Sequence, residues 1–194
     1  MNIFQLYLHL GINHIADFRS YDHILFITCL CAVYLFKQWK QILVLITAFT
    51  IGHTTSLVLA TMKIIVFPLP IIEFLIPLTI FITALWNLFI KSDGVNIKTH
   101  WVKYITALFF GLIHGLGFSN YLQTLLGKES SIIMPLFSFN VGIEIGQIII
   151  VSIILIVSYI LTSWFKVARR DWVFIFSGAG LGVSSTLMID RFPW

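Results

Sequence analysis

Six long apolar runs divide the chain, and they constrain its fold more than any other feature of the sequence. The runs cover approximately residues 22–36, 41–60, 70–90, 101–126, 132–165 and 171–188. A membrane-spanning helix needs about 20 consecutive apolar residues, and only short polar connections separate these runs. The sequence therefore predicts an all-α, polytopic integral membrane bundle of about six transmembrane helices.

Composition leaves little room for anything else. Charged residues make up 10% of the 194 residues, and the mean hydropathy is +0.98. Because a soluble domain carries about 25% charged residues, a soluble fold is excluded. We expect a single membrane domain over residues 1–194. Residues 1–20 hold several polar side chains, and we expect them to form a short amphipathic helix lying at the membrane interface.

Lysine and arginine are scattered, mostly between the apolar runs, which argues against a nucleic-acid site and predicts membrane topology. Eight of them lie near the breaks that follow the first, third and fifth runs: Lys37, Lys40, Lys91, Lys98, Lys103, Lys166, Arg169 and Arg170. Four lie on the other side: Arg19, Lys63, Lys128 and Arg191. Since cytoplasmic loops are enriched in basic residues, we expect a multi-pass protein of the inner (cytoplasmic) membrane with both termini extracytoplasmic.

Ionisable side chains inside or next to the apolar runs are costly in a bilayer, so they are candidates for function. The ionisable and amide candidates are His14, Asp22, His23, His53, Glu73, His114, Asn140, Glu144 and Gln147. At about 1.5 Å of rise per residue, all of them fall near the midplane or in the outer half. In the inner half of the spans we expect only hydroxyl and carboxamide side chains. The sequence therefore predicts a polar cup that opens to the outside above an apolar floor.

Imidazole together with carboxylate is the ligand chemistry of a divalent transition metal, with nickel or zinc favoured. The predicted metal ligands are His14, Asp22, His23, His53, His114 and Glu144, supported by Asn140, Gln147 and Glu73. Nearby glycines would allow the helices to approach closely. Other interpretations stay open, because Asp22, His23 and Glu73 also fit helix starts, and Asn140 and Gln147 also fit hydrogen bonds between helices. His9 and His100 are expected in loops or at the interface.

Five segments together resemble the HupE/UreJ group of membrane proteins, which is associated with nickel supply to hydrogenase and urease. They are GINHIADFRSYDHILF, FTIGHTTSL, the third run from Glu73 to Trp86-Asn87, FFGLIHGLGF and FNVGIEIGQ, and they extend from Gly11 to Gln147. The resemblance implies six or seven membrane helices and a role in handling nickel or another divalent metal. On the matching positions it implies that the six predicted ligands interact with the metal.

Three functions follow from these observations. The first is a permease that takes a nickel-like cation from outside and carries it across the membrane. The second is an intramembrane metalloenzyme near the outer leaflet, in which Glu144 or Asp22 acts as general base on metal-activated water and Asn140 or Gln147 orients an oxyanion. No HExxH signature supports this second function, and no catalytic residue is assigned. The third is an accessory subunit stabilised by metal, in a membrane complex or a homo-oligomer.

Overall fold

The computed structural model describes residues 2–17, 21–90, 95–127 and 131–193. Within these residues the chain is all-helical, and its elements are α1 (Ile3–Ala16), α2 (Asp22–Cys31), the 3-10 turn η1 (Phe36–Gln38), α3 (Trp39–Thr61), α4 (Leu69–Asn87), α5 (Ile97–Leu126), α6 (Ile133–Ser163) and α7 (Arg169–Asp190). Arg19, Lys91 and Lys128, which entered the topology prediction, lie outside the described residues.

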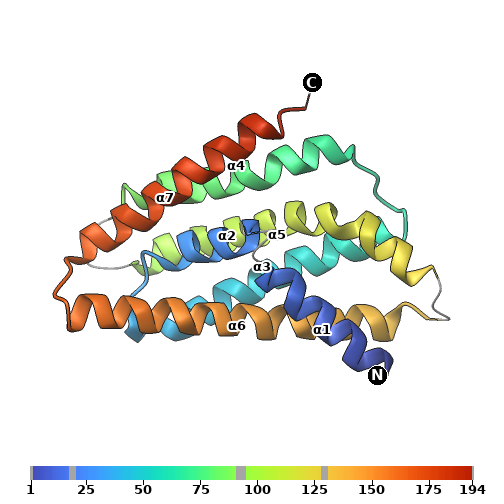
Figure 1. Cartoon of the computed structure of the whole chain (residues 1–194), viewed down its shortest axis with the longest axis horizontal. Helices are drawn as coiled ribbons and strands as arrows, with labels where there is room; N and C mark the ends of the chain where they lie inside the picture. The colour runs from blue at the N-terminus through green and yellow to red at the C-terminus, as the bar shows by residue number, and fades with distance from the viewer. Residues whose placement is uncertain (1, 18–20, 91–94, 128–130, 194) are drawn as a thin grey trace.

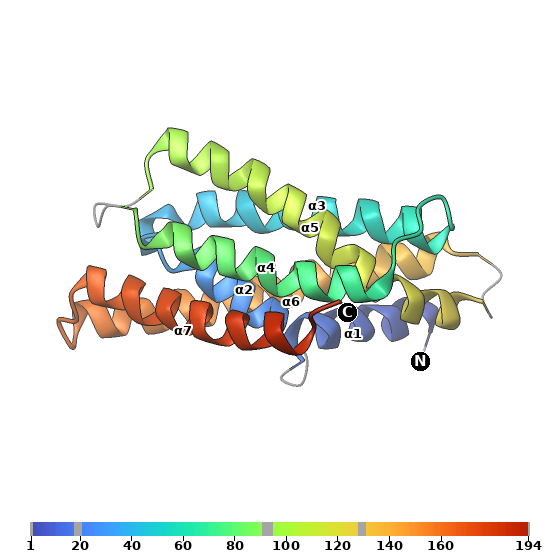
Figure 2. The same ribbon diagram turned by 90° about the horizontal axis from the view of Figure 1, so that it is seen from above.

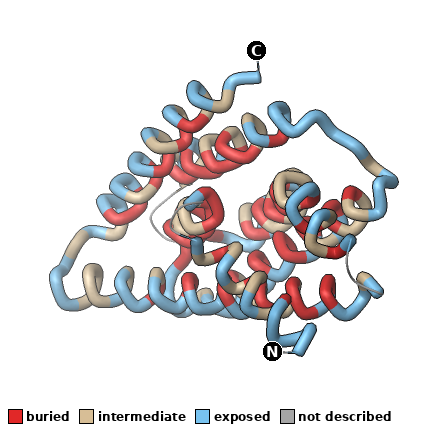
Figure 3. The backbone as a smooth tube through the Cα atoms, turned by 45° about the vertical axis from the view of Figure 1, so that its right-hand side comes forward, coloured by how far each residue is buried: buried red, intermediate tan, exposed pale blue. Residues whose placement is uncertain are grey.

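Five of the described helices, α3 to α7, are long and apolar enough to cross a membrane. They agree with the second to sixth expected spans to within four residues at either end. Large apolar side chains cover their outward faces, as in α6, where Ile149, Ile153 and Ile156 are at least half exposed. Figure 3 shows buried residues turned inward and exposed residues turned outward on these helices. This is the pattern of a multi-pass membrane protein with lipid around it.

The first expected span, 22–36, is not a full-length helix. Helix α2 has ten residues and is about 15 Å long, roughly half of a bilayer core. It ends inside the bundle, where side chains from other helices bond the backbone at its end and just beyond it: Asn87 Nδ2 donates to Cys29 O at 2.6 Å, and Arg169 donates to Val33 O, two residues past Cys31. Helices α1 and α2 follow one another along the long axis of the bundle (Figures 1 and 2).

The N-terminal segment forms the helix α1, which packs along α6, and its expected position at the membrane interface stays a prediction. Its start is fixed by a capping box in which Asn2 Oδ1 accepts from Gln5 N–H at 2.8 Å. The contact with α6 depends on two glycines: a Cβ at Gly11 would lie 2.1 Å from Phe139 O, and a Cβ at Gly142 would lie 2.2 Å from Leu8 O. Only glycine therefore allows these two backbones to approach so closely.

Three helix pairs make the most extensive contacts, namely α3 with α5, α1 with α6 and α4 with α7. The α3–α5 pair is also a glycine contact, since a Cβ at Gly52 would lie 2.1 Å from Leu108 O and one at Gly111 would lie 2.2 Å from Phe49 O. The short helix α2 packs among the pairs, against α4, α6 and α7. This arrangement brings residues from both halves of the chain to the start of α2.

The bundle has two ends, which differ in their connections (Figure 1). The N-terminal end holds the start of α1, the α3–α4 connection, the last turn of α5 and the last turn of α7. The basic end holds the α2–α3, α4–α5 and α6–α7 connections, whose described residues include Lys37 and Lys166.

Candidate metal centre

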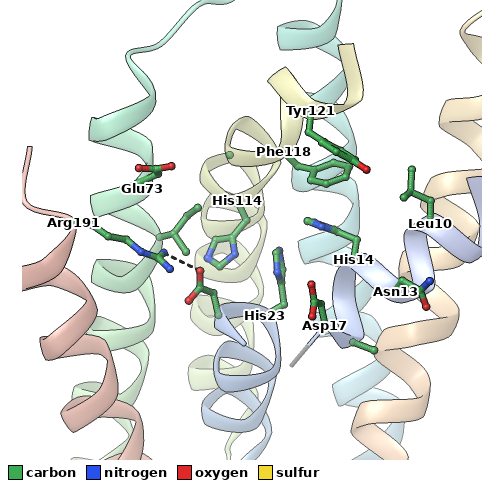
Figure 4. Close-up of a pocket in the computed structure, with 14 residues that line it drawn as sticks. Leu10, Asn13, His14, Asp17, His23, Glu73, His114, Phe118, Tyr121 and Arg191 are labelled. Atoms are coloured by element: carbon green, nitrogen blue, oxygen red, sulfur yellow. Dashed lines mark hydrogen bonds and ion pairs between the residues drawn. The ribbon is translucent and has the colours of Figure 1, made fainter. Parts of the chain in front are cut away.

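Four histidines from four different helices meet in the middle of the bundle: His14 of α1, His23 of α2, His53 of α3 and His114 of α5. His14, His23 and His53 each offer one nitrogen, and these three atoms all lie within 4.8 Å of one another. Ring centroids are 4.7 Å apart for His14 and His23, and 5.8 Å apart for His14 and His53. His114 stands beside this group, with its ring centroid 5.2 Å from that of His23 (Figure 4).

Most nitrogen atoms of this histidine cluster are buried without a hydrogen bond. His53 is completely buried, His114 and His23 are buried, and His14 is half-buried. Among the residues that the structure describes, six of these nitrogens have no partner: His14 Nε2, both nitrogens of His23, both of His53, and His114 Nδ1. Buried polar atoms in proteins almost always have a partner, so a set of this size points to a ligand.

Thr79 fixes which nitrogen of His114 is available. The Thr79 hydroxyl donates its one proton to Ile76 O at 2.7 Å, so it must accept from His114 Nε2–H at 3.0 Å. The lone pair of the neutral imidazole is then on Nδ1, the atom that has no partner within the described residues. A hydrogen bond from the opposite nitrogen is how proteins orient a histidine that binds a metal.

The dimensions of the cluster suit a single metal ion. Imidazole nitrogens bind Zn²⁺ at about 2 Å, so two nitrogens on one ion are no more than about 4 Å apart. The nitrogens of His14, His23 and His53 lie within 4.8 Å of one another, and a small rotation of these side chains brings them to that spacing. These three residues can therefore hold a divalent transition metal, and His114 Nδ1 is the neighbouring fourth nitrogen.

Asp22 adds a carboxylate at the start of α2, directly before His23. Its Oδ2 forms an ion pair with Arg191 Nη1 at 2.8 Å, while its Oδ1 is buried without a partner among the described residues. In the sequence, Arg191 serves only as one of the basic residues that predict the membrane topology. Its position just beyond the last apolar run gives no sign that it reaches α2, which is 169 residues away in sequence.

A cavity of about 890 Å³ lies beside the histidine cluster, toward the N-terminal end. It is lined by three of the histidines and by the charged residues Asp17, Asp22, Glu73 and Arg191, with Phe118 and Tyr121 of α5 in its wall. Figure 4 shows these side chains turned toward one space from α1, α2, α4, α5 and the end of α7. Three carboxylates against one guanidinium give the lining a formal excess of negative charge, which favours a cation.

Phenylalanines close the cluster on the side of the basic end. Phe26, Phe49 and Phe110 each lie one helical turn from a histidine of the cluster, and all three are buried. Phe26 lies 5.0 Å from Phe49 and 6.2 Å from Phe110 between ring centroids. Phe26 and Phe49 also contact His114, each at 5.2 Å. This phenylalanine layer is an apolar floor beneath the histidines.

The polar residues of α6 lie elsewhere, on the face that meets α3. Thr47 donates to Glu144 Oε1 at 2.6 Å and Thr50 donates to Gln147 Oε1 at 2.8 Å. Asn140 is bonded to Thr54 in the same way. The structure thus places these three predicted residues in a seam between two helices and does not bring them into the three-histidine group. A role for Glu144 in metal binding stays a prediction.

Lys103 corrects the expectation that the half of the bundle toward the basic end has no ionisable side chain. It belongs to α5, which begins at Ile97, four residues before the expected span, and it is only 1% exposed. Its Nζ donates to Asn87 Oδ1 at 2.9 Å and lies 5.2 Å from the Trp86 ring. His100, one turn earlier, is also buried and is bonded to Tyr34.

The chain matches the profile of one protein family, described as HupE / UreJ protein, over residues 1–190. The matched range includes all four histidines and Asp22. No curated protein and no solved structure matches the chain.

Proposed function

Because this chain belongs to the HupE/UreJ family, we propose that its histidine cluster binds a divalent transition-metal ion and that the protein carries this ion across the membrane. The observation that carries the proposal is the set of six buried imidazole nitrogens without hydrogen-bond partners among the described residues, contributed by four helices. Neutral imidazole suits nickel and zinc, and the association of the family with nickel makes Ni²⁺ the first ion to test.

In this proposal the cavity supplies the route of entry. A hydrated cation is attracted by the carboxylates of Asp17, Asp22 and Glu73, which line the cavity at the N-terminal end. Its water ligands are then exchanged for the nitrogens of His14, His23 and His53. His114 is held by Thr79 with its Nδ1 directed beside this group and supplies a fourth position.

We further propose that the N-terminal end faces outward and that the basic end faces the cytoplasm of the inner membrane. The support is the excess of lysine and arginine near the basic end. The phenylalanine layer then lies between the bound ion and the cytoplasm. Transport requires Phe26, Phe49 and Phe110 to separate, so the described conformation corresponds to the state that is open to the outside.

The test is metal uptake into proteoliposomes combined with metal analysis of the purified protein. His14→Ala should abolish Ni²⁺ uptake, whereas His9→Ala is a matched control on the same helix, where His9 is exposed and should leave uptake unchanged. Uptake that persists in both His14→Ala and His53→Ala would reject transport through this cluster.

A metalloenzyme is the second candidate, and two observations favour it. The cavity of about 890 Å³ is within the range of small-molecule pockets, about 300–1,000 Å³, and the phenylalanine layer closes the neighbouring histidine cluster on one side. A three-histidine metal would leave a position open for water, with the Asp22 carboxylate next to it. One tightly held metal ion per chain, together with no uptake of Ni²⁺ or Zn²⁺, would support this function over transport.

A further inference from the structure

Arg191 is the residue of the cavity to which neither the family match nor the sequence pattern gives a role. It is the C-cap of α7, and its guanidinium extends across the cavity to Asp22 at the start of α2. Its side chain is 30% exposed and that of Asp22 is 12% exposed, so water screens the pair only partly. A contact between the rings of Phe192 and Phe74, 5.2 Å apart between centroids, holds this end of α7 against α4.

Arg191 shares the cavity with two carboxylates from other helices, and Figure 4 labels one of them, Glu73. One is Asp22, whose Oδ2 it binds and whose Oδ1 has no partner among the described residues. The other is Glu73 of α4, which lines the same cavity. Phe74 and Phe192 directly follow Glu73 and Arg191, and their ring contact holds the end of α7 beside the start of α4.

We propose that Arg191 is a tethered cation that competes with the incoming metal ion for Asp22. A divalent ion at the histidine cluster attracts the Asp22 carboxylate, which is adjacent to His23, and repels the guanidinium. The Asp22–Arg191 pair therefore opens when the ion binds, and Arg191 moves to Glu73. This inference rests on the proposed metal site, and it makes Arg191 a positioning residue that sets the affinity of that site.

Such a pair explains how the site discriminates between cations. A monovalent ion gains no more from the Asp22 carboxylate than the guanidinium already does, so it does not displace Arg191. A divalent ion gains from both the carboxylate and the imidazole nitrogens. The pair also compensates the Asp22 charge while no metal is bound, which a buried carboxylate in a bilayer requires.

The experiment is titration of the purified full chain in lipid nanodiscs with Co²⁺, whose visible absorption reports coordination, and with Ni²⁺ by calorimetry. Arg191→Gln removes the competing charge, so it should tighten binding about tenfold. Arg191→Lys keeps the charge but loses the planar guanidinium with its several donors, so the gain in metal affinity should be smaller. Arg170→Gln is the matched control, because Arg170 is on the same helix at the basic end, against Phe174, and should have no effect.

Two further variants separate the competition from a general effect of charge. In Asp22→Asn the pair no longer exists, so adding Arg191→Gln should bring a gain several-fold smaller than the same change brings in the wild type. Glu73→Gln removes the second acceptor, so it should weaken binding about threefold. An unchanged or weaker affinity in Arg191→Gln, with metal still bound by the wild type, overturns this proposal and leaves the metal site standing. No binding by either the wild type or Arg191→Gln rejects both.

Discussion

The histidine cluster and the polar group around Lys103 are both buried in the bundle, yet they differ in how their polar atoms are satisfied. Asn87 is bonded on both sides: its Nδ2 donates to Cys29 O at 2.6 Å and to Ser177 Oγ at 3.2 Å, and its Oδ1 accepts from Lys103. The histidines have six nitrogens without a partner among the described residues. Burial alone therefore does not single out the histidine cluster, whereas this concentration of unpartnered nitrogens from four helices does.

The difference also separates two kinds of energetic role. The Asn87–Lys103 group bonds the end of α2, so its atoms contribute to the stability of the fold. The histidines make few hydrogen bonds within the described residues, and their burial costs stability that only a ligand recovers. Substitutions in one region should change the free energy of unfolding, and substitutions in the other should change the affinity for metal.

The largest effect is expected from His53→Ala, which removes a completely buried side chain of the proposed metal site. The affinity for Ni²⁺ should fall roughly 1,000-fold, which is about 4 kcal/mol of binding free energy. His100→Ala is the control, since His100 is buried in the other region and bonded to Tyr34, and it should leave the affinity unchanged. Calorimetric titration measures both; equal affinities for the two variants would remove the distinction between the regions.

Gly115→Ala tests whether glycine contacts hold the histidines in place. A Cβ at Gly115 would lie 2.2 Å from His53 O, so α3 and α5 must move apart, and we expect a loss of about 3 kcal/mol in the free energy of unfolding. A Cβ at Gly182 of α7 would meet no described atom within 4 Å, so Gly182→Ala should be neutral or slightly stabilising. Denaturant titration in detergent compares the two variants, and similar stabilities would contradict the role of the contact.

Asn87→Ala should lower the free energy of unfolding by about 2 kcal/mol, because it leaves Cys29 O without its donor and Lys103 without its acceptor. The affinity of the same variant for Ni²⁺ should remain that of the wild type. A thermal unfolding curve and a metal titration on one preparation measure both quantities. A loss of affinity without a loss of stability would assign the Lys103 region to metal handling.

Acidification should give the smallest effect. Protons compete with the metal for imidazole nitrogens, so lowering the pH by about one unit should weaken Ni²⁺ binding by at most about threefold. The sign is fixed, because only the deprotonated nitrogen is a ligand. Asn87→Ala should show the same dependence as the wild type when Ni²⁺ titrations are repeated across pH. Binding that strengthens on acidification would exclude imidazole ligands.

The sequence predicts the long helices well because apolar length is a local property. Helices α3 to α7 agree with the expected spans to within four residues. The end of α2 at Cys31 is not a local property, since the backbone on either side of it is bonded by Asn87 and Arg169, which come from distant parts of the chain. The run 22–36 continues past that point without a change in composition.

The candidate site is predicted in part for the same reason. Rise per residue gives the depth of a side chain, and His14, His23 and His53, expected in the same half of the bundle, lie close together. Rise does not give the direction around the helix axis, so it cannot show that Glu144 faces the threonines of α3. Arg191 requires still more, since its role depends on the packing of α7 against α4.

The glycine contacts have a mechanical consequence. They make α3 and α5 one rigid body, which carries His53 and His114, and they make α1 and α6 another, which carries His14. Such close backbone contacts do not deform gradually, so the separation of His53 from His114 is held more firmly than that of His14 from His53, where side-chain hydrogen bonds join α3 to α6. In the proposed function, a metal ion bound by both His14 and His53 would be a reversible cross-link between these two helix pairs.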